Sequence, residues 1–85
     1  MEIVLSSAAR KDREFWKTSG NKQIQKKIEE LIIDIQEHPF TGIGQPEALK
    51  HNLSGFWSRR INREHRIIYQ VMDGMIGITS LKGHY

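Results

Sequence analysis

Residues 66–81 read RIIYQVMDGMIGITSL, and this stretch predicts a β-hairpin. β-Branched and aromatic residues dominate both arms, and Asp73-Gly74 between them is typical of a tight two-residue turn. Alternation along the first arm puts three residues on one side of the strand, and we expect this side to lie under helices: Ile67, Tyr69 and Val71. The alternate positions of the first arm are too polar for a core and too apolar for a plain solvent face, so they would suit a half-open cleft.

The segment before the hairpin predicts a further antiparallel strand over residues 53–61, joined to the hairpin by a polar turn at 62–65. If this turn leaves Asn62 opposite Arg66, then Arg60 lies opposite Ile68 and points into the cleft. A pairing one residue tighter would put Arg59 there instead. Residues 47–51 predict a turn of helix, and residues 40–46, which contain two glycines and a proline, predict a loop.

Two helices are expected upstream of that loop. Apolar residues at 24, 28, 31, 32 and 35 recur with helical spacing, with Asn21 as a cap and Pro39 ending the helix. An earlier helix should begin after Ser6 or Ser7 and run to about Thr18, and residues 2–5 read as a strand. The order β-α-α-β-β-β predicts an α+β fold, a two-layer sandwich with a mainly antiparallel sheet and two helices on one face, as a single domain over 1–85.

Charge and composition limit the function classes. The net charge is +3, and all of this excess lies in residues 45–85, because residues 1–44 hold seven basic and seven acidic residues. A polyanionic partner is therefore best met by the C-terminal half. There is no cysteine, and the four histidines lack ligand-like spacing, so no metal or cofactor is expected. No apolar run fits a signal peptide or a membrane span, which favours a cytoplasmic protein without a membrane partner.

Titratable and cationic residues are concentrated in residues 46–66, PEALKHNLSGFWSRRINREHR, and at the final His84-Tyr85. Metal-free RNA cleavage by the 2′-hydroxyl needs a base, cations for the phosphate and an acid for the departing 5′-oxygen. Glu47 is a candidate base, His84 a candidate acid, and Tyr85 could hold the phosphate or stack on a base. Arg60 and Arg66 could clamp the phosphate.

Lys50, His51 and Arg59 complete the candidate RNA- and phosphate-binding set. Taken singly, each candidate has a plain structural interpretation. Lys50 could be a solvated lysine, Arg59 with Arg60 a basic strand edge, and the last two residues a frayed terminus. Their co-occurrence is what favours a site.

The sequence resembles the YoeB branch of the RelE/ParE toxin superfamily. The resemblance rests on QPEALKHNLSGFWSRRINREHRIIYQV, on the helix KKIEELIIDIQEHPF, on the loop TGIGQPE and on the terminal GHY. It implies a microbial-ribonuclease-like fold and a toxin of a type II toxin–antitoxin pair that cleaves messenger RNA in the ribosomal A site. It also implies a YefM-like antitoxin whose C-terminal segment wraps the toxin, with promoter DNA contacted only through the complex. The sequence leaves a homodimer open.

The resemblance carries the family's site over residue by residue. The family's glutamate, which follows a proline, falls on Glu47. The resemblance implies that Glu47 is the base and His84 the acid, although the residues alone allow the reverse assignment. The remaining family positions fall on Lys50, Arg60, Arg66 and Tyr85. The sequence departs from the family at Lys82-Gly83, where relatives commonly carry an Arg-Tyr pair.

These observations predict a metal-independent, ribosome-dependent messenger-RNA endoribonuclease that leaves a 2′,3′-cyclic or 3′-phosphate. The modest net charge fits an enzyme that gains most of its affinity from the ribosome. Two alternatives remain from other classes: a non-catalytic, ParE-like toxin that inhibits a protein target, and a plain RNA-binding module.

Overall fold

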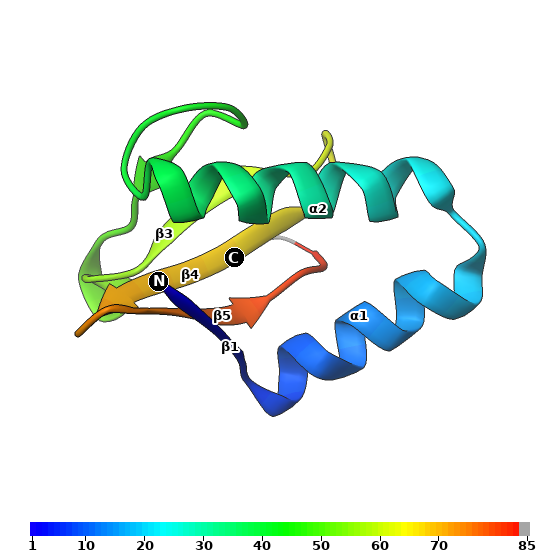
Figure 1. The fold of residues 1–85 in the computed structure, drawn as a ribbon, viewed down its shortest axis with the longest axis horizontal. Helices are drawn as coiled ribbons and strands as arrows, with labels where there is room; N and C mark the ends of the chain where they lie inside the picture. Colours follow the sequence, from blue (N-terminus) through cyan, green and yellow to red (C-terminus); the bar gives the residue numbers. More distant parts are fainter. Residues whose placement is uncertain (84–85) are drawn as a thin grey trace.

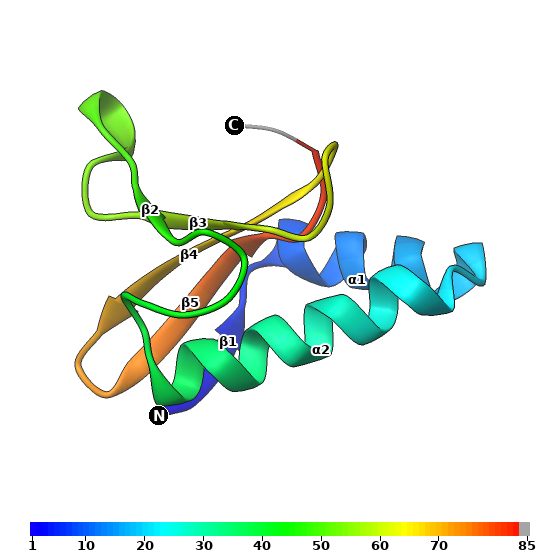
Figure 2. The same cartoon turned by 90° about the horizontal axis from the view of Figure 1, so that it is seen from above.

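Two helices cover one face of a five-stranded sheet (Figures 1 and 2). The opposite face, which these helices leave uncovered, is called the open face below. The computed structural model describes residues 1–83 of the chain. Helix α1 spans Ser7–Ser19 and helix α2 spans Lys22–Glu37. Within residues 1–83, neither helix is long and apolar enough to cross a bilayer.

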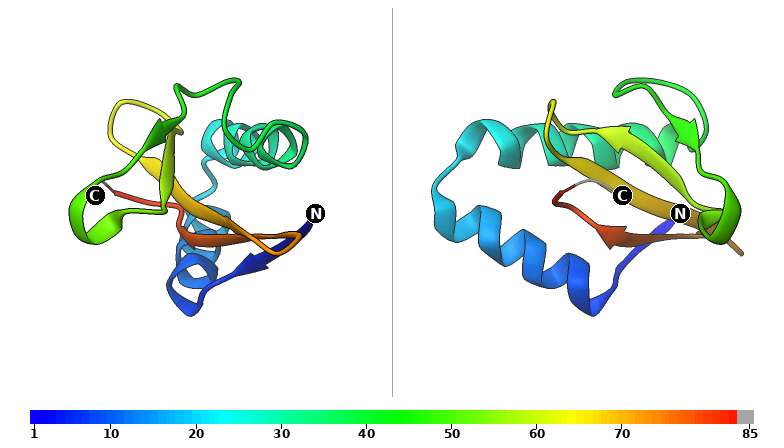
Figure 3. Two further views of the ribbon diagram at one scale, coloured as in Figure 1. Left: turned by 90° about the vertical axis from the view of Figure 1, so that its left-hand side faces the viewer. Right: turned by 180° about the vertical axis from the view of Figure 1, so that it is seen from behind.

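The sheet has the strand order β1-β5-β4-β3-β2 and twists beneath the helices, as Figure 3 shows from two further sides. Strand β1 pairs in parallel with β5, and the other pairs are antiparallel. The predicted α+β sandwich with a mainly antiparallel sheet is therefore confirmed. The strands are β1 (Glu2–Leu5), β2 (Glu47–Ala48), β3 (Trp57–Arg60), β4 (Arg66–Met72) and β5 (Met75–Ser80).

Both helices begin at the expected caps. The Ser6 side chain accepts a hydrogen bond from the Ala9 amide, and the Asn21 side chain accepts one from the Ile24 amide, so each satisfies a backbone donor that the first helical turn leaves open. Helix α1 ends at Gly20, whose φ of 73° is left-handed and therefore favours glycine. Helix α2 ends at His38, before the proline, as the sequence predicted.

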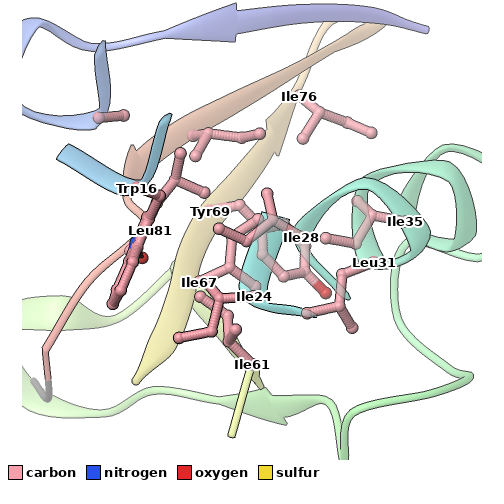
Figure 4. Packing of buried hydrophobic residues seen from close by; sticks show 12 residues of the cluster. Trp16, Ile24, Ile28, Leu31, Ile35, Ile61, Ile67, Tyr69, Ile76 and Leu81 are labelled. Carbon is pink, nitrogen blue, oxygen red and sulfur yellow. Dashed lines mark hydrogen bonds between the residues drawn. The ribbon is translucent and has the colours of Figure 1, made fainter. Parts of the chain in front are cut away.

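The core lies between both helices and the helix-facing side of β4 and β5 (Figure 4). The apolar stripe of α2 packs here as expected, and Ile67 and Tyr69 of β4 are completely buried against it. Val71, the third residue predicted for this side, packs partly buried at the margin of the same cluster. Burial of this apolar surface supplies the main driving force for docking the helical layer on the sheet.

Arg59 lies inside this core with no solvent exposure. Its guanidinium donates to five acceptors, as many as it has N–H groups. Nε donates to the Tyr69 hydroxyl at 3.1 Å, and Nη1 donates to Asp34 at 2.5 Å. The remaining bonds go to backbone carbonyls of the loop between α2 and β2, those of His38, Thr41 and Ile43.

The buried charge is tolerated because Asp34 neutralises it and the loop satisfies its remaining donors. The hydrogen bond from Arg59 lowers the pKa of Asp34 against the opposing effect of its own desolvation. Burial raises the pKa of Tyr69, whose hydroxyl in turn donates to the Pro39 carbonyl at 2.7 Å. The loop packs so closely that a Cβ on Gly42 would lie 2.0 Å from the Asp34 carboxylate.

Two local predictions were wrong. Residues 47–51 do not form a turn of helix: Glu47–Ala48 is the edge strand β2, and the helical turn follows at His51–Leu53 as a 3-10 segment. The strand expected over 53–61 is limited to Trp57–Arg60, because this turn and Gly55, with a φ of 95°, interrupt extended backbone.

Neither of the two β3–β4 pairings that the sequence left open is found. Arg60 lies opposite Arg66 rather than opposite Ile68. The cause is the turn, in which the Asn62 side chain accepts hydrogen bonds from the amides of Glu64 and His65, so that Asn62 lies within the turn and not opposite Arg66. The shift preserves alternation, so Arg60 still points to the open side of the sheet.

Asp34→Asn is expected to lower the free energy of unfolding by roughly 3 kcal/mol at neutral pH, because it leaves the Arg59 charge buried without its counter-ion. The pKa of Asp34 is lowered in the folded state, so its contribution is complete above the unfolded value of ~3.9 and is lost as the pH falls through the folded value. The difference in the free energy of unfolding between the wild type and Asp34→Asn should therefore become smaller below about pH 4.

Denaturant titrations from pH 7 to pH 3 measure this difference in the free energy of unfolding. Glu30→Gln is the matched control, because it removes the same charge from an exposed position one turn earlier on α2. An Asp34→Asn protein as stable as the Glu30→Gln protein would contradict the proposed role of the pair.

Candidate active site

Strands β2, β3 and β4 place a row of residues on the sheet face away from the helices. Glu47 pairs with Ser58, and Ser58 pairs with Ile68. Arg60 and Arg66 form the next pair on this face. Neighbouring strands lie ~4.8 Å apart and a two-residue step is ~6.6 Å, so Glu47 and both arginines start within side-chain reach of one another.

These three residues line one open hollow of about 380 Å³, together with Gln45, Pro46 and Ser58. The hollow combines one carboxylate and two guanidiniums over a floor that includes the buried Ser58. Guanidiniums bind phosphate oxygens through paired N–H donors, and a carboxylate beside them can accept a proton from a bound group. The structure thus brings together three of the residues that the sequence predicted for one site.

Glu47 is positioned by the loop that surrounds Arg59. The Arg60 amide donates to the Gly44 carbonyl at 2.7 Å, which fastens the end of this loop to β3 just before Glu47. A Cβ on Gly44 would lie 2.7 Å from Leu31, so only glycine permits this close approach. Gln45, next in the chain, has a φ of 53°, an uncommon conformation for a residue with a side chain.

Arg66 is oriented by the β3–β4 turn. Its Nη1 donates to the Asn62 carbonyl at 2.8 Å and makes longer hydrogen bonds to the carbonyls of Arg63 and His65. Three acceptors on one nitrogen fix the plane of the guanidinium, since its fork of donors is rigid. The Arg66 side chain is half-buried, whereas Arg60 is exposed.

Lys50 and His51 lie beside this hollow rather than in it. Both are exposed and line a second hollow of about 340 Å³, to which Glu47 also contributes. His51 has a φ of 60° at the start of the 3-10 turn. The two hollows meet at Glu47, so Lys50 and His51 extend the cationic surface along the sheet edge.

Arg59 does not belong to this surface, and its prediction as a phosphate-binding residue needs correction. Its side chain is on the helix side of β3, fully buried, with its donors directed to protein acceptors. Alternation could have identified this, because Arg59 shares its side of the strand with Trp57 and Ile61, which pack in or against the core.

His84 and Tyr85, the predicted acid and phenol, lie outside the described residues. The chain is described up to Gly83, whose carbonyl accepts a hydrogen bond from the Arg66 amide at 3.0 Å and whose amide donates to His65 Nδ1 at 2.9 Å. The end of the described chain is therefore fixed beside Arg66. Sequence reasoning treated His65 only as a turn residue and missed this contact.

A metal centre finds no support in the part of the chain that the structure describes: no three His, Cys, Asp or Glu side chains converge there to hold an ion. The chemistry that this surface offers comes from its carboxylate and its cations.

Comparison with known proteins gives consistent matches over the whole chain. The family model for a YoeB-like toxin of bacterial type II toxin-antitoxin systems matches residues 5–85. Toxin YoeB of Escherichia coli strain K12 is 48% identical over 85 residues, which is 100% of both chains.

Two solved structures from Staphylococcus aureus superpose closely on the fold. One is a YoeB-YefM complex, 45% identical with a TM-score of 0.90, and the other is a YoeB dimer, 44% identical with a TM-score of 0.91. Each match covers 100% of this chain and 98% of the other. The chain belongs to the YoeB-like toxin family of bacterial type II toxin–antitoxin systems.

Proposed function

We propose that this toxin is a ribosome-dependent endoribonuclease that cuts messenger RNA in the ribosomal A site and so blocks translation. The observation that supports this most is the shared hollow of Glu47, Arg60 and Arg66 on the open face of the sheet. A toxin that acts by binding a protein needs no carboxylate beside two guanidiniums that are close enough to bind one phosphate. A plain RNA-binding module needs the cations but not the carboxylate.

The proposed reaction starts with a scissile phosphate held by Arg60 and Arg66. Glu47 accepts the proton of the adjacent 2′-hydroxyl, whose oxygen forms a bond to phosphorus. The two guanidiniums stabilise the negative charge that accumulates on the phosphoryl oxygens. The bond to the 5′-oxygen breaks, His84 supplies a proton to that oxygen, and the product is a 2′,3′-cyclic phosphate that water can open to a 3′-phosphate.

The two terminal residues enter this scheme from their position in the sequence. His84 follows directly after Gly83, which is fixed to the backbone of Arg66. We propose that His84 and Tyr85 act in the same hollow, with Tyr85 contacting the phosphate or stacking on a base. The reverse assignment, with His84 as base and Glu47 as acid, uses the same atoms and gives the same product.

Lys50 and His51 are proposed to bind the RNA next to the scissile phosphate. Their hollow adjoins that of the arginines at Glu47, so a strand bound across both would pass over the carboxylate. Their contribution is to hold the backbone rather than to transfer protons. No metal ion or cofactor takes part in the proposed reaction.

The partners follow from the family and from this site. We propose a YefM-like antitoxin as partner, which the YoeB-YefM complex from Staphylococcus aureus supports. We further propose that this antitoxin wraps the toxin and that promoter DNA is bound only through the toxin–antitoxin complex. The dimeric Staphylococcus aureus relative suggests a homodimer of this chain as well. Ribosomes and messenger RNA as targets imply that the toxin acts in the cytoplasm.

Arg60→Ala and Arg66→Ala are each expected to slow cleavage on programmed ribosomes by about 10²–10³-fold, since each removes one charge that stabilises the transition state. Primer extension on a defined message measures the rate. Arg63→Ala is the matched control: it removes the same charge from the neighbouring turn, but Arg63 does not line the hollow with Glu47. An Arg63→Ala rate reduced as far as that of Arg60→Ala would indicate a general charge effect and contradict a phosphate clamp.

Glu47→Gln is expected to reduce cleavage by roughly 10²–10⁴-fold and to relieve growth arrest on expression, because the amide cannot accept the 2′-hydroxyl proton. His84→Ala should behave in the same way. Colony counts after induction, with Glu64→Gln as a control of equal charge in the exposed turn, give the readout. Growth arrest that persists in both Glu47→Gln and His84→Ala would favour the ParE-like inhibitor and exclude a nuclease.

A further inference from the structure

The chain that follows β5 is held by side chains from helix α1. The Asp12 carboxylate accepts a hydrogen bond from the Leu81 amide at 2.9 Å, and Trp16 Nε1 donates to the Leu81 carbonyl at 2.9 Å. The backbone amide and carbonyl of Leu81 are thus bound by two side chains that lie one turn apart on α1. Lys82 adds a further contact, with its ammonium 4.3 Å from the centre of the Phe15 ring.

His65 extends this support to the last described residue. Its Nδ1 accepts a hydrogen bond from the Gly83 amide at 2.9 Å, which requires a neutral imidazole with its proton on Nε2. The ring meets Trp16 edge to face with a centroid distance of 4.8 Å. The backbone of His65 is fixed in turn by the Asn62 side chain, which accepts from its amide, and by the Ile61 amide, which donates to its carbonyl.

Gly83 is fitted to this arrangement. Its carbonyl accepts a hydrogen bond from the Arg66 amide, so both of its polar groups are bound by two consecutive residues of the turn and β4. Its φ of 82° is in the left-handed region, where a side chain introduces strain.

We propose that His65 is a positioning residue for the reaction: with Asp12 and Trp16 it clamps residues 81–83 beside Arg66, the segment that leads into the proposed acid His84. This inference rests on the proposed nuclease function. Proton transfer requires donor and acceptor within hydrogen-bond distance, and a displacement of about 1 Å can cost about 10²-fold in rate. The two hydrogen bonds of Gly83 limit such a displacement of the last described residue.

His65→Phe and His65→Asn separate the acceptor from the ring. Phenylalanine keeps the edge-to-face contact with Trp16 but has no acceptor, whereas the side-chain oxygen of asparagine can take the place of Nδ1. We expect His65→Phe to reduce the single-turnover cleavage rate at saturating ribosome complex by about 10–10²-fold, with little change in the complex concentration giving half-saturation. His65→Asn should recover at least half of that loss on a logarithmic scale.

Hydrogen exchange of the Gly83 amide in the free toxin measures how firmly the hydrogen bond to His65 holds, and this measurement does not depend on RNA cleavage. His65→Phe should raise the exchange rate of this amide about tenfold, His65→Asn should raise it less, and amides in the middle of α2 should stay as in the wild type. Unchanged α2 amides show that the fold is intact. A variant that fails this check is replaced by His65→Leu, which also lacks an acceptor.

Three outcomes would overturn the proposal. If the Gly83 amide exchanges equally in the wild type and in His65→Phe, the hydrogen bond does not hold the segment. If exchange rises but the saturating cleavage rate is unchanged, the anchor does not position a catalytic group, while the nuclease function stands. A wild-type toxin that cuts no RNA would overturn the nuclease function and the catalytic consequence of the clamp, and the exchange data would still decide whether His65 anchors Gly83.

Discussion

The buried guanidinium of Arg59 is the interaction on which the rest of this structure depends. It joins β3 to Tyr69 on β4, to Asp34 on α2 and to three carbonyls of the loop that follows α2. Because successive side chains of a strand point to opposite faces, placing Arg59 in the core places Arg60 on the open face. Because the same loop continues into β2, the contacts of Arg59 also set the position of Glu47.

The open face carries an electrostatic cost. Arg60 and Arg66 lie directly opposite each other on neighbouring strands, and like charges in such a pair destabilise a sheet. Three turn carbonyls bind one nitrogen of Arg66 and offset part of this repulsion. An anion between the two guanidiniums would remove the remainder. The fold therefore obtains its stability on the helix side and concentrates unfavourable charge where a phosphate is proposed to bind.

Much of the fold follows from local patterns in the sequence. Helical spacing and the Asn21 cap located α2, and alternation in β4 identified its buried side. The β3–β4 pairing could not be predicted, because it depends on how the Asn62 side chain closes the turn. The two-residue strand β2 carries too little pattern to distinguish it from a helical turn.

The site was only partly accessible to the same reasoning. Charge density and the resemblance located Glu47, Arg60 and Arg66. Alternation along β3 agrees with the inward position of Arg59, but its partners could not be predicted, above all Asp34, 25 residues away in sequence. The contact of His65 with Gly83 likewise joins residues 18 apart and leaves no periodic signal.

In the proposed reaction, one phosphate in the hollow is attacked by its own neighbouring 2′-hydroxyl. The most direct measurement uses a message with a single 2′-deoxy nucleotide immediately 5′ to the scissile phosphate, at the cut position mapped on the all-ribose message. We expect this message to bind ribosomes normally but not to be cut there, while the all-ribose message yields a 2′,3′-cyclic or 3′-phosphate end. Cleavage of the deoxy message at the same position, or a product with a 3′-hydroxyl end, would contradict the proposed reaction.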